Sequence, residues 1–512
     1  LLQNPRWMIY IAQILQQEKQ RNKLFTTNND EIDYKYMVVL IKIVQVIFAL
    51  SILVLAHELG HFLFAKLFKT RVNKFYLFFN PYFSIMRAKK IDGKWRFKFF
   101  SRNLPTYEGN NKIDVNTLPE DDWRRHPENT EYGIGWLPLG GYCAIAGMID
   151  ESMDKEAMKL PPQPYEFRTK PAWQRFFIMF GGVLFNFILA VLLYGAIMNV
   201  WGDEYLRNED AIYGIAVNDL SYEIGFRDGD RILDFDGVPT ENFAMLQVDM
   251  VRSQAEKARV LRGEDTLTIS IDPQYIAAIL NTPGMFDLAF PFVVGGFAEG
   301  SINADSGLEI GDEIKGIDSV SMFLAQEIRK ELANHKESTV FATISRNGDL
   351  INIPLQVDSS GMIQVMLDTD LTKFFTITSH DYNFLTAIPA GCKRAWNNVR
   401  NYVQELGLLI SPKTKAYKSV GSFIAIGKIF PGNWDWYRVW SLTAMLSIML
   451  GVLNLLPIPA LDGGHILFLL IEIITRRKPS DKVLEVAQTI GMILLIALMI
   501  LAFGNDIRGL FT

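Results

Sequence analysis

A His-Glu-x-x-His motif at residues 57–61 lies inside an apolar stretch that is long enough to cross a bilayer. On a helix, His57 and His61 are about one turn apart, so both imidazoles can reach one metal ion, and Glu58 projects close by as a candidate proton shuttle. Unpaired ionisable groups are costly at membrane depth. Because a bound divalent metal compensates for this cost, the motif indicates a metal site within the membrane.

The composition favours a membrane protein. With 512 residues, the chain is longer than a single domain. With 49% hydrophobic residues, it is richer in apolar residues than an ordinary soluble protein. Its net charge of −5 offers no electrostatic footprint for nucleic acid, so we expect no nucleic-acid partner. Cys143 and Cys392 are far apart and lack metal-ligand spacing, which argues against a disulfide framework or a Cys-based zinc site.

Four stretches have the length and apolar content of membrane spans, namely residues 37–67, 173–201, 437–456 and 483–503. Basic residues follow the first span, precede the second span and join the third span to the fourth. Since basic connections favour the cytoplasmic side, we expect the long segment between the second and third spans to be extracytoplasmic and the metal motif to lie near the cytoplasmic face. These basic residues are Lys66, Lys69, Arg71, Lys74, Lys170, Arg175, Arg476, Arg477, Lys478 and Lys482.

Residues 1–36 differ from the rest of the chain. They are polar, lack an initiating Met and end just before Met37 begins the first apolar run. We therefore expect Met37 to be the natural start and the preceding residues to be an extension or tag without a function.

The region between the first two spans, residues 70–150, is expected to form β-hairpins associated with the membrane. Residues 74–79 and 94–100 have the aromatic and alternating pattern of strands, with Asn-Pro and Asp-Gly turns nearby. The polar residues 101–130 indicate an insertion or mobile loop. Residues 136–142 are too apolar for a solvated loop, so we expect them to dip towards the membrane beside the metal site.

An internal repeat at an offset of 82 residues follows the second span. Residues 225–236 match residues 307–318, and each copy places a Gly-Asp turn before a short apolar strand. Farther upstream, Gly214 matches Gly296 at the same offset. The spacing predicts two small tandem β-rich domains.

These two predicted domains, residues 203–290 and 291–368, resemble PDZ domains. PDZ domains bind extended peptides by adding a strand to a sheet edge. PDZ-like modules can also act as steric filters, and the sequence leaves both roles open.

A helical region is expected at residues 369–436. Within it, residues 383–409 place basic side chains on one side of a helix and apolar side chains on the other, with too mixed a composition to span a membrane. This pattern predicts an interfacial amphipathic helix, with a soluble helix packed on its neighbours as the alternative.

A catalytic zinc ion needs three protein ligands and an open position, and the His-Glu-x-x-His motif supplies only two. Residues 454–465, after the third span, read Asn-Leu-Leu-Pro-Ile-Pro-Ala-Leu-Asp-Gly-Gly-His. Irregular backbone at membrane depth is tolerated only where it lines a cavity, so this segment is a candidate for the rest of the site. A capped helix end would explain its glycines but not Asn454 or the prolines. The residues alone leave Asp462 and His465 open as the third ligand.

Together, the two motifs resemble those of the site-2 protease family of intramembrane metalloproteases, peptidase M50, in its bacterial RseP type. The order of parts from residue 37 to the C-terminus is also similar. The resemblance implies a multi-pass α-helical membrane protein with four transmembrane helices, membrane-associated β-hairpins and two tandem PDZ-like α+β domains. Its successive parts are expected at residues 37–69, 70–150, 151–202, 203–290, 291–368, 369–436, 437–475 and 476–512.

By this resemblance, His57, His61 and Asp462 ligate Zn²⁺ and Glu58 activates the water. Asn454 would contact the substrate backbone or help to steady the oxyanion.

Five further residues are implied in substrate binding by the family's motifs. Gly140 and Gly141 match a segment that precedes the second span, and Pro457 and Pro459 belong to the irregular segment after the third span. Asn186 lies in a Gly-Val-x-x-Asn sequence where the family usually has Gly-Pro-x-x-Asn, a departure that leaves its assignment less secure.

The resemblance implies a zinc metalloendopeptidase that cleaves transmembrane segments of single-span membrane proteins after another protease has trimmed their ectodomains. The family suggests an anti-sigma factor or remnant signal peptides as substrates, in the inner (cytoplasmic) membrane of a bacterium, with the PDZ-like domains outside the cytoplasm. Strand pairing with the hairpins before Gly140 is expected to unwind the substrate. A catalytically silent membrane scaffold of the same fold is the alternative, and a transporter is disfavoured because transporters usually repeat their spans.

Overall fold

The structure is a computed structural model, and it describes residues 28–104, 107–108, 111–112, 117–120, 122–138, 140–148, 161–282, 284–410 and 421–511. Most of the predicted N-terminal extension and parts of the predicted insertion lie outside the described residues. The chain forms two compact units, which are described separately. The membrane unit comprises Ile32–Trp201, Tyr382–Val403 and Val420–Thr512, and the strand-rich unit consists mainly of Gly202–Asp381.

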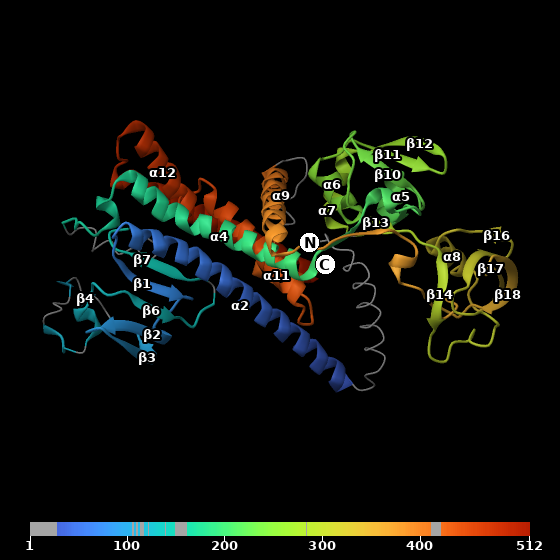
Figure 1. Cartoon of the computed structure of the whole chain (residues 1–512), viewed down its shortest axis with the longest axis horizontal. Helices are drawn as coiled ribbons and strands as arrows, with labels where there is room; N and C mark the ends of the chain where they lie inside the picture. The colour runs from blue at the N-terminus through green and yellow to red at the C-terminus, as the bar shows by residue number, and fades with distance from the viewer. Residues whose placement is uncertain are drawn as a thin grey trace. The chain divides into compact units, whose positions relative to one another are not determined.

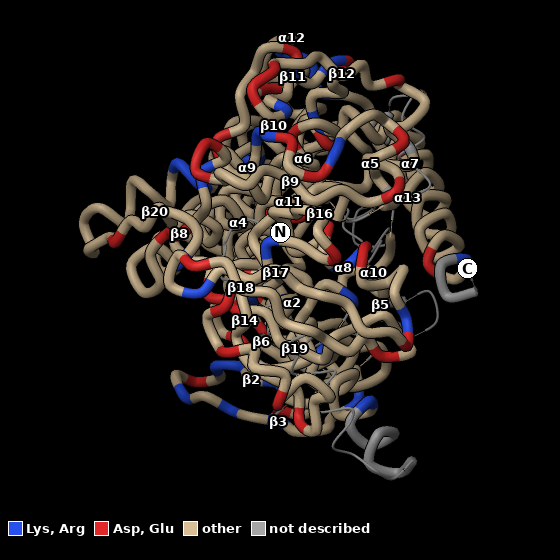
Figure 2. The backbone as a smooth tube through the Cα atoms, turned by 90° about the vertical axis from the view of Figure 1, so that its right-hand side faces the viewer, with Lys and Arg blue, Asp and Glu red and all other residues tan. Residues whose placement is uncertain are grey.

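Four helices of the membrane unit are long and apolar enough to cross a bilayer, as the sequence predicts. Large apolar side chains such as Leu192 and Ile500 stay exposed on them, as expected for positions that face lipid. Acidic and basic residues are interspersed along the strands and connections that Figure 2 shows, such as those around β10, β11 and β12 within residues 231–270. The four helices are α2 (Asn28–Leu67), α4 (Ala172–Trp201), α11 (Trp436–Leu455) and α13 (Asp481–Phe511).

The helices of the membrane unit approach closely where their residues are small. Helix α4 packs against α11 and against α12 (Asp462–Thr475), as Figure 1 shows. A Cβ added to Gly60 of α2 would lie 2.1 Å from the carbonyl oxygen of Gly181 of α4. The backbones of α2 and α4 therefore touch at this crossing, which small residues permit in membrane helices.

The connection before α11 is held by buried polar side chains. Gln45 of α2 is fully buried, and its Nε2 donates to the carbonyl oxygens of Pro431 at 3.3 Å and Asn433 at 2.9 Å. The backbone N–H of Ser422, which precedes α10 (Phe423–Ile429), donates to Asp506 of α13. Since lipid offers no hydrogen-bond partners, these two donors are satisfied inside the protein.

The predicted third membrane region, residues 437–475, consists of two helices. Helix α11 ends at Leu455 and α12 begins at Asp462. Pro457 and Pro459 lack backbone donors, and Ala460 has a φ of 88°, so the chain does not continue as one helix. Asp462 therefore begins a helix, whereas the sequence had indicated that it lies at a helix end.

A five-stranded mixed sheet lies beside the C-terminal part of α2 (Figure 1), where Phe75 packs against Phe62 with ring centroids 5.1 Å apart. The predicted strands at residues 74–79 and 94–100 correspond to its β1 and β3. Strand β2 was not predicted, because Arg87 and Lys89 interrupt its apolar pattern, although both side chains are buried. The strand order is β3 (Lys94–Arg102), β2 (Phe83–Ile91), β6 (Glu131–Ile134), β1 (Val72–Leu77), β7 (Tyr142–Ile145), with β1 parallel to β6 and antiparallel to β7.

The part of the predicted insertion around Trp123 is packed against this sheet. Trp123, in the short helix η2 (Trp123–Arg125), is almost fully buried, and its carbonyl oxygen accepts a hydrogen bond from Lys89 Nζ at 2.9 Å. The ammonium group of Lys98 lies over its ring, 4.8 Å from the centroid. Trp123 therefore anchors this part of the insertion to the sheet. The insertion also contains a short strand pair, β4 (Tyr107–Glu108) and β5 (Asn111–Lys112).

The strand-rich unit contains the two copies of the repeat, each with its own hydrophobic core. In the first copy, β10 (Arg231–Phe235), β11 (Lys257–Arg262) and β12 (Asp265–Ser270) form one sheet, and β9 (Ile215–Val217) pairs with β13 (Phe286–Leu288). In the second copy, β15 (Glu313–Ile317), β17 (Thr339–Arg346) and β18 (Asp349–Gln356) take the same order, and β14 (Phe292–Phe297) pairs with β19 (Val365–Leu367). The remaining elements of the unit are α5 (Asp219–Ile224), α6 (Leu246–Arg252), α7 (Ile276–Asn281), β16 (Val320–Ser321), α8 (Ala325–Leu332), and the paired β8 (Asp203–Leu206) and β20 (Ile377–His380).

An Arg–Asp clamp recurs at the same place in both copies. In the second copy, Arg346 donates to Asp312 and to the carbonyl oxygen of Gly307. Arg262 and Asp230 form the equivalent pair in the first copy. The hydrogen bond from Arg346 lowers the pKa of Asp312, so this buried carboxylate stays charged and paired. The Gly-Asp turn of the repeat is therefore stabilised by an arginine from a later strand.

Equivalent backbone hydrogen bonds refine the alignment of the two copies. The N–H groups of Ile215 and Val294 each donate to the carbonyl oxygen of a clamp aspartate. Ile215 is therefore equivalent to Val294, and the predicted match of Gly214 with Gly296 is wrong. The segment between the first strand and the turn is longer in the second copy, so a constant offset does not apply there.

Helix α9 (Phe384–Ile410) corresponds to the helix predicted at residues 383–409. A Cβ on Gly391 would lie 2.5 Å from the backbone nitrogen of Gly195, so small residues bring α9 against α4. Leu385 and Trp396 remain 77% and 69% exposed. This exposed apolar side is what an interfacial helix requires, and its position at a membrane surface stays a prediction.

Candidate metal centre

His57 and His61 lie on successive turns of α2, and both side chains are buried. Gly60 lies between them in the sequence, and because it has no side chain it allows the α4 backbone to approach α2. The two imidazoles therefore lie in the crossing between the two helices.

Asp462 reaches the same place from the start of α12, where the free N–H groups of the first helical turn favour a carboxylate. The far end of α12 is tied to α4 by the largely buried ion pair of Arg175 with Glu472. A Cβ on Gly491 of α13 would lie 1.5 Å from the carbonyl oxygen of Pro459, so α13 packs directly on the turn that precedes Asp462. Two neighbouring helices thus hold the aspartate in position.

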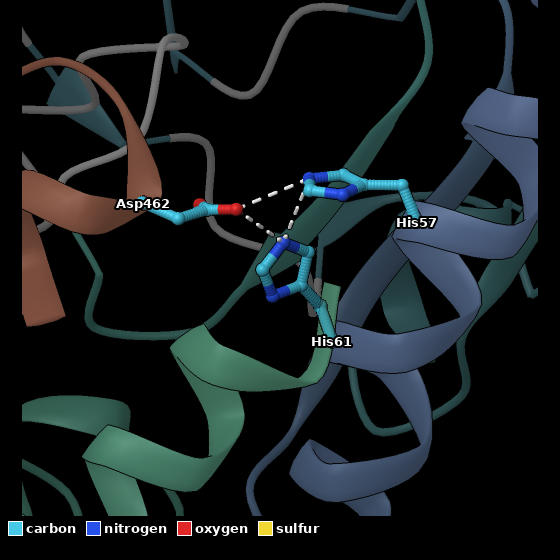
Figure 3. A group of neighbouring side chains, drawn as sticks. All are labelled: His57, His61 and Asp462. Atoms are coloured by element: carbon cyan, nitrogen blue, oxygen red, sulfur yellow. Dashed lines mark hydrogen bonds and ion pairs between the residues drawn. The ribbon is translucent and has the colours of Figure 1, made fainter. Parts of the chain in front are cut away.

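The three side chains converge on one point, as Figure 3 shows. Asp462 Oδ2 lies 3.1 Å from His57 Nε2 and 3.4 Å from His61 Nε2, and the two Nε2 atoms are 3.3 Å apart. Ligand atoms that bind a tetrahedral zinc ion at about 2.0–2.2 Å are roughly 3.3–3.6 Å from one another. The observed separations are close to those of three corners of a zinc coordination sphere.

The donor set also fits zinc. Two imidazole nitrogens and one carboxylate oxygen are typical of a catalytic site that keeps a fourth position for water or substrate. Asp462 Oδ2 is buried, and it contacts Nε2 of His57 and Nε2 of His61, which are themselves metal-binding atoms. Because a buried carboxylate oxygen needs a partner, a metal ion bound by these residues explains the arrangement.

Hydrogen bonds around the triad orient its members. His61 Nδ1 lies 2.8 Å from the carbonyl oxygen of Ile178. A carbonyl oxygen only accepts, so His61 carries its proton on Nδ1 and has Nε2 free for a metal. Asn454, at the end of α11, places its Nδ2 3.4 Å from His57 Nε2. Asn186 of α4 places its Nδ2 3.1 Å from His57 Nδ1.

Gly182 is a part of the site that the sequence did not identify. It lies in α4 directly against the imidazoles, where a Cβ would be 2.5 Å from His61 Nε2 and 2.7 Å from His57 Cε1. The sequence signal was the Gly-Gly pair at residues 181–182 within an otherwise apolar span. Ile178, whose carbonyl oxygen orients His61, carries no such signal because its side chain does not take part.

We expect Gly182→Ala to weaken zinc binding by at least about tenfold, because the added methyl group displaces the ligand atom of His61 and the tight crossing prevents α4 from moving away. Zinc retained by the purified protein during dialysis against a chelator measures the effect. Gly195→Ala in the same helix is the control, since its Cβ would have no neighbour closer than 3.5 Å. Equal zinc retention by the two variants would contradict the packing described.

Glu58 is joined to the sheet. Its carboxylate accepts a hydrogen bond from the backbone N–H of Cys143 in β7. A Cβ on Gly141, just before β7, would lie 2.6 Å from the carbonyl oxygen of Tyr76 and 2.7 Å from Val54. Gly140 has a φ of 159° and lies against Phe79. These two glycines allow the edge strand β7 to approach α2 beside the metal triad.

The structure distinguishes between the two candidates for the third ligand. His57, His61 and Asp462 form the one group of three or more His, Cys, Asp or Glu residues in the described part of the chain that is close enough to hold a metal ion. His465 lies outside this group, and its Nε2 is 3.2 Å from Gln488 Nε2 of α13. The structure therefore places Asp462, and not His465, with the two histidines.

A membrane protein with a His-Glu-x-x-His helix and a third ligand from a later membrane segment has the architecture of a membrane-embedded metallopeptidase. A sequence model described as peptidase family M50 matches residues 45–101 and 116–498, and the chain belongs to this family. It is accordingly a metalloendopeptidase. The unmatched residues 102–115 fall within the predicted insertion.

Named relatives agree with this assignment. The chain is 27% identical over 409 residues to a Xylella fastidiosa (strain 9a5c) protein named "Putative zinc metalloprotease". The aligned residues cover 75% of this chain and 89% of the relative. The chain is 25% identical over 500 residues to Protease RseP of Yersinia pestis, covering 93% of this chain and 100% of the relative. It is also 25% identical over 490 residues to the Regulator of sigma-E protease RseP of Salmonella typhimurium, covering 91% and 98%.

Proposed function

We propose that this protein is an intramembrane zinc metalloprotease that cleaves the transmembrane segments of single-span membrane proteins. The observation that carries the proposal is the convergence of His57, His61 and Asp462 at ligand spacing, with Glu58 on the same membrane helix. A structural metal site would not require a glutamate between its two histidines.

The residues of the site divide the chemistry between them. Zinc, when bound, supplies a Lewis acid that polarises the scissile carbonyl and lowers the pKa of an attacking water towards neutrality. Glu58 accepts the proton of that water and passes it to the leaving amine. Asn454, whose amide lies beside the ligand atoms, donates a hydrogen bond to the substrate carbonyl oxygen as negative charge develops on it.

The substrate must be extended to react, because a helix protects its peptide bonds with internal hydrogen bonds. The edge of the sheet nearest the catalytic glutamate is β7, whose Cys143 contacts Glu58. Strand β3, which belongs to the hairpins before Gly140 that were expected to pair with the substrate, lies at the opposite edge. We therefore assign substrate pairing to β7, and Gly140 and Gly141 act by seating that strand. A cross-link from a substrate span to residues 142–145, and not to residues 94–102, would support this assignment.

The two copies of the repeat act as PDZ-like domains that exclude substrates with large ectodomains. Their separate cores and shared strand order support two similar modules. In this proposal the modules are extracytoplasmic, in the inner membrane of a bacterium, and the metal centre lies near the cytoplasmic face. An anti-sigma factor with one span and remnant signal peptides are the substrate classes that we propose.

Removing residues 203–380 should allow cleavage of untrimmed substrate, because the size filter is lost while the metal centre is retained. Asp203 and His380 are paired across β8 and β20, so a short flexible linker can join the cut ends. The measurement is the ratio of cleavage rates for a substrate with and without its folded ectodomain. The full chain should strongly prefer the trimmed substrate, and the deletion should bring the ratio towards equality. An unchanged ratio in an active deletion variant would rule out the filter.

The proposed activity is tested by reconstituting the protein in liposomes with a single-span model substrate. Mass spectrometry of the products should locate the cut within the apolar span. A substrate that is cut only outside its span, or not at all, would contradict the assignment.

A further inference from the structure

Asn186 is completely buried in α4, two turns after Ile178 and one turn after Gly182. These three residues follow one another at intervals of four and share one face of the helix. Ile178 contacts His61 through its carbonyl oxygen, Gly182 makes room for both imidazoles, and Asn186 contacts His57. Helix α4 supplies no ligand itself, yet this face touches both histidines.

The hydrogen bonding of His57 depends on Asn186. Nε2 of His57 faces the other two ligand atoms, at 3.1 Å from Asp462 Oδ2 and 3.3 Å from His61 Nε2. A histidine that binds a metal through Nε2 carries its proton on Nδ1, and that N–H needs an acceptor. Among the described residues, Asn186 is the hydrogen-bond partner recorded for His57 Nδ1.

The carboxamide of Asn186 can act as that acceptor. Nδ2 of Asn186 lies 3.1 Å from His57 Nδ1, while Oδ1 of Asn186 is buried and has no hydrogen-bond partner among the described residues. The two ends of a carboxamide have nearly the same shape, so a half-turn of the group places Oδ1 against the Nδ1–H of His57. The turned amide satisfies the oxygen and selects the tautomer that a metal requires.

The position of Asn186 is fixed by α11. Ser447 Oγ donates to the backbone carbonyl oxygen of Asn186 at 2.7 Å, and a Cβ on Gly451 would lie 3.4 Å from the Cβ of Asn186. A side chain without solvent exposure, held on both sides by helices, is poorly placed to bind substrate. This location favours a supporting role for Asn186 over the direct substrate contact expected from the sequence.

We propose that Asn186 is a positioning residue that accepts a hydrogen bond from Nδ1 of His57 and thereby keeps Nε2 of His57 available to zinc. The inference rests on the proposed metal centre and extends it to a residue outside the ligand set. Partners of this kind fix the ring orientation and tautomer of a ligand, and their loss typically weakens metal binding by about 10- to 100-fold.

The test is a competitive chelator titration of zinc on the full-length protein in detergent, comparing wild type, Asn186→Leu and Asn186→Asp. Leucine has a similar size and no acceptor, so the zinc dissociation constant should rise by about 10- to 100-fold. Aspartate keeps an acceptor at the same reach, so its dissociation constant should stay within a few-fold of wild type. Cobalt(II)-loaded samples should show an altered visible spectrum for Asn186→Leu and a spectrum close to wild type for Asn186→Asp.

Thr443→Ala is the matched control, because it removes a buried hydroxyl of α11 that bonds to the carbonyl oxygen of Val439 in its own helix and leaves Asn186 and His57 unchanged. It should bind zinc as wild type does. Should Asn186→Leu fail to fold, Asn186→Ser replaces it, since the shorter hydroxyl does not reach the imidazole. Wild-type zinc affinity in Asn186→Leu or Asn186→Ser, or equally weak binding by Asn186→Asp, overturns the inference. Absence of zinc binding in wild type overturns the metal centre itself, which distinguishes the two failures.

Discussion

Glu58→Gln is expected to abolish cleavage of a transmembrane substrate while leaving the zinc content unchanged. The amide keeps the shape of the side chain and can still accept the hydrogen bond from Cys143, but it cannot take a proton from water. The loss of a general base typically slows a reaction by about 10²- to 10⁴-fold. Single-turnover cleavage in liposomes measures the rate, and elemental analysis of the same sample measures the zinc.

Glu128→Gln is the control for this substitution. Glu128 is an exposed glutamate of the same unit and lies outside the metal triad, so its variant should cleave at the wild-type rate. If Glu58→Gln cleaves as fast as this control, Glu58 has no catalytic role. If it loses its zinc, the substitution disturbs the site and the proton-transfer role is not supported.

Asp462→Ala is expected to lose both zinc and activity. The change removes one of three protein ligands, so the affinity should fall by more than the roughly 100-fold that loss of a supporting hydrogen bond costs. His465→Ala, three residues later, should retain zinc because His465 contacts Gln488 outside the triad. Chelator titration of both variants separates the two residues. Zinc loss in His465→Ala with retention in Asp462→Ala would show that the third ligand has been misassigned.

The spans and the two-histidine half of the site could be predicted from the sequence because both are local. Hydropathy identifies a membrane helix within about 20 residues, and helix geometry places His57 and His61 on adjoining turns. The third ligand is not local. The residues alone left Asp462 and His465 open, and the family resemblance favoured Asp462. The packing of α12 and α13 around the turn is what brings Asp462 to the histidines.

The residues that support the triad were harder to identify for a related reason. Ile178 contributes a backbone oxygen, and Gly182 contributes the absence of a side chain. Neither contribution comes from a side-chain functional group, and the Gly-Gly pair at residues 181–182 is the one sequence signal of the two. Asn186 did stand out as a polar residue in a span, but its contact with His57 depends on the crossing of α2 and α4.

The sheet and the repeat show how long-range pairing limits such predictions. The parallel pairing of β1 with β6 joins Lys74 to Glu131 across the whole insertion, and no turn chemistry signals it. In the repeat, the Gly-Asp turn was recognisable because Asp230 and Asp312 are each needed by an arginine clamp. The first strands were misaligned because their sequences carry no comparable constraint.

X-ray absorption at the zinc edge of the purified wild-type protein tests the central claim most directly. We expect one zinc ion per chain, bound by two imidazole nitrogens and carboxylate or water oxygen at about 2.0–2.2 Å, and absent from Asp462→Ala. A protein that copurifies with no zinc and binds none when it is added, or a zinc ion bound by sulfur at about 2.3 Å, would contradict it.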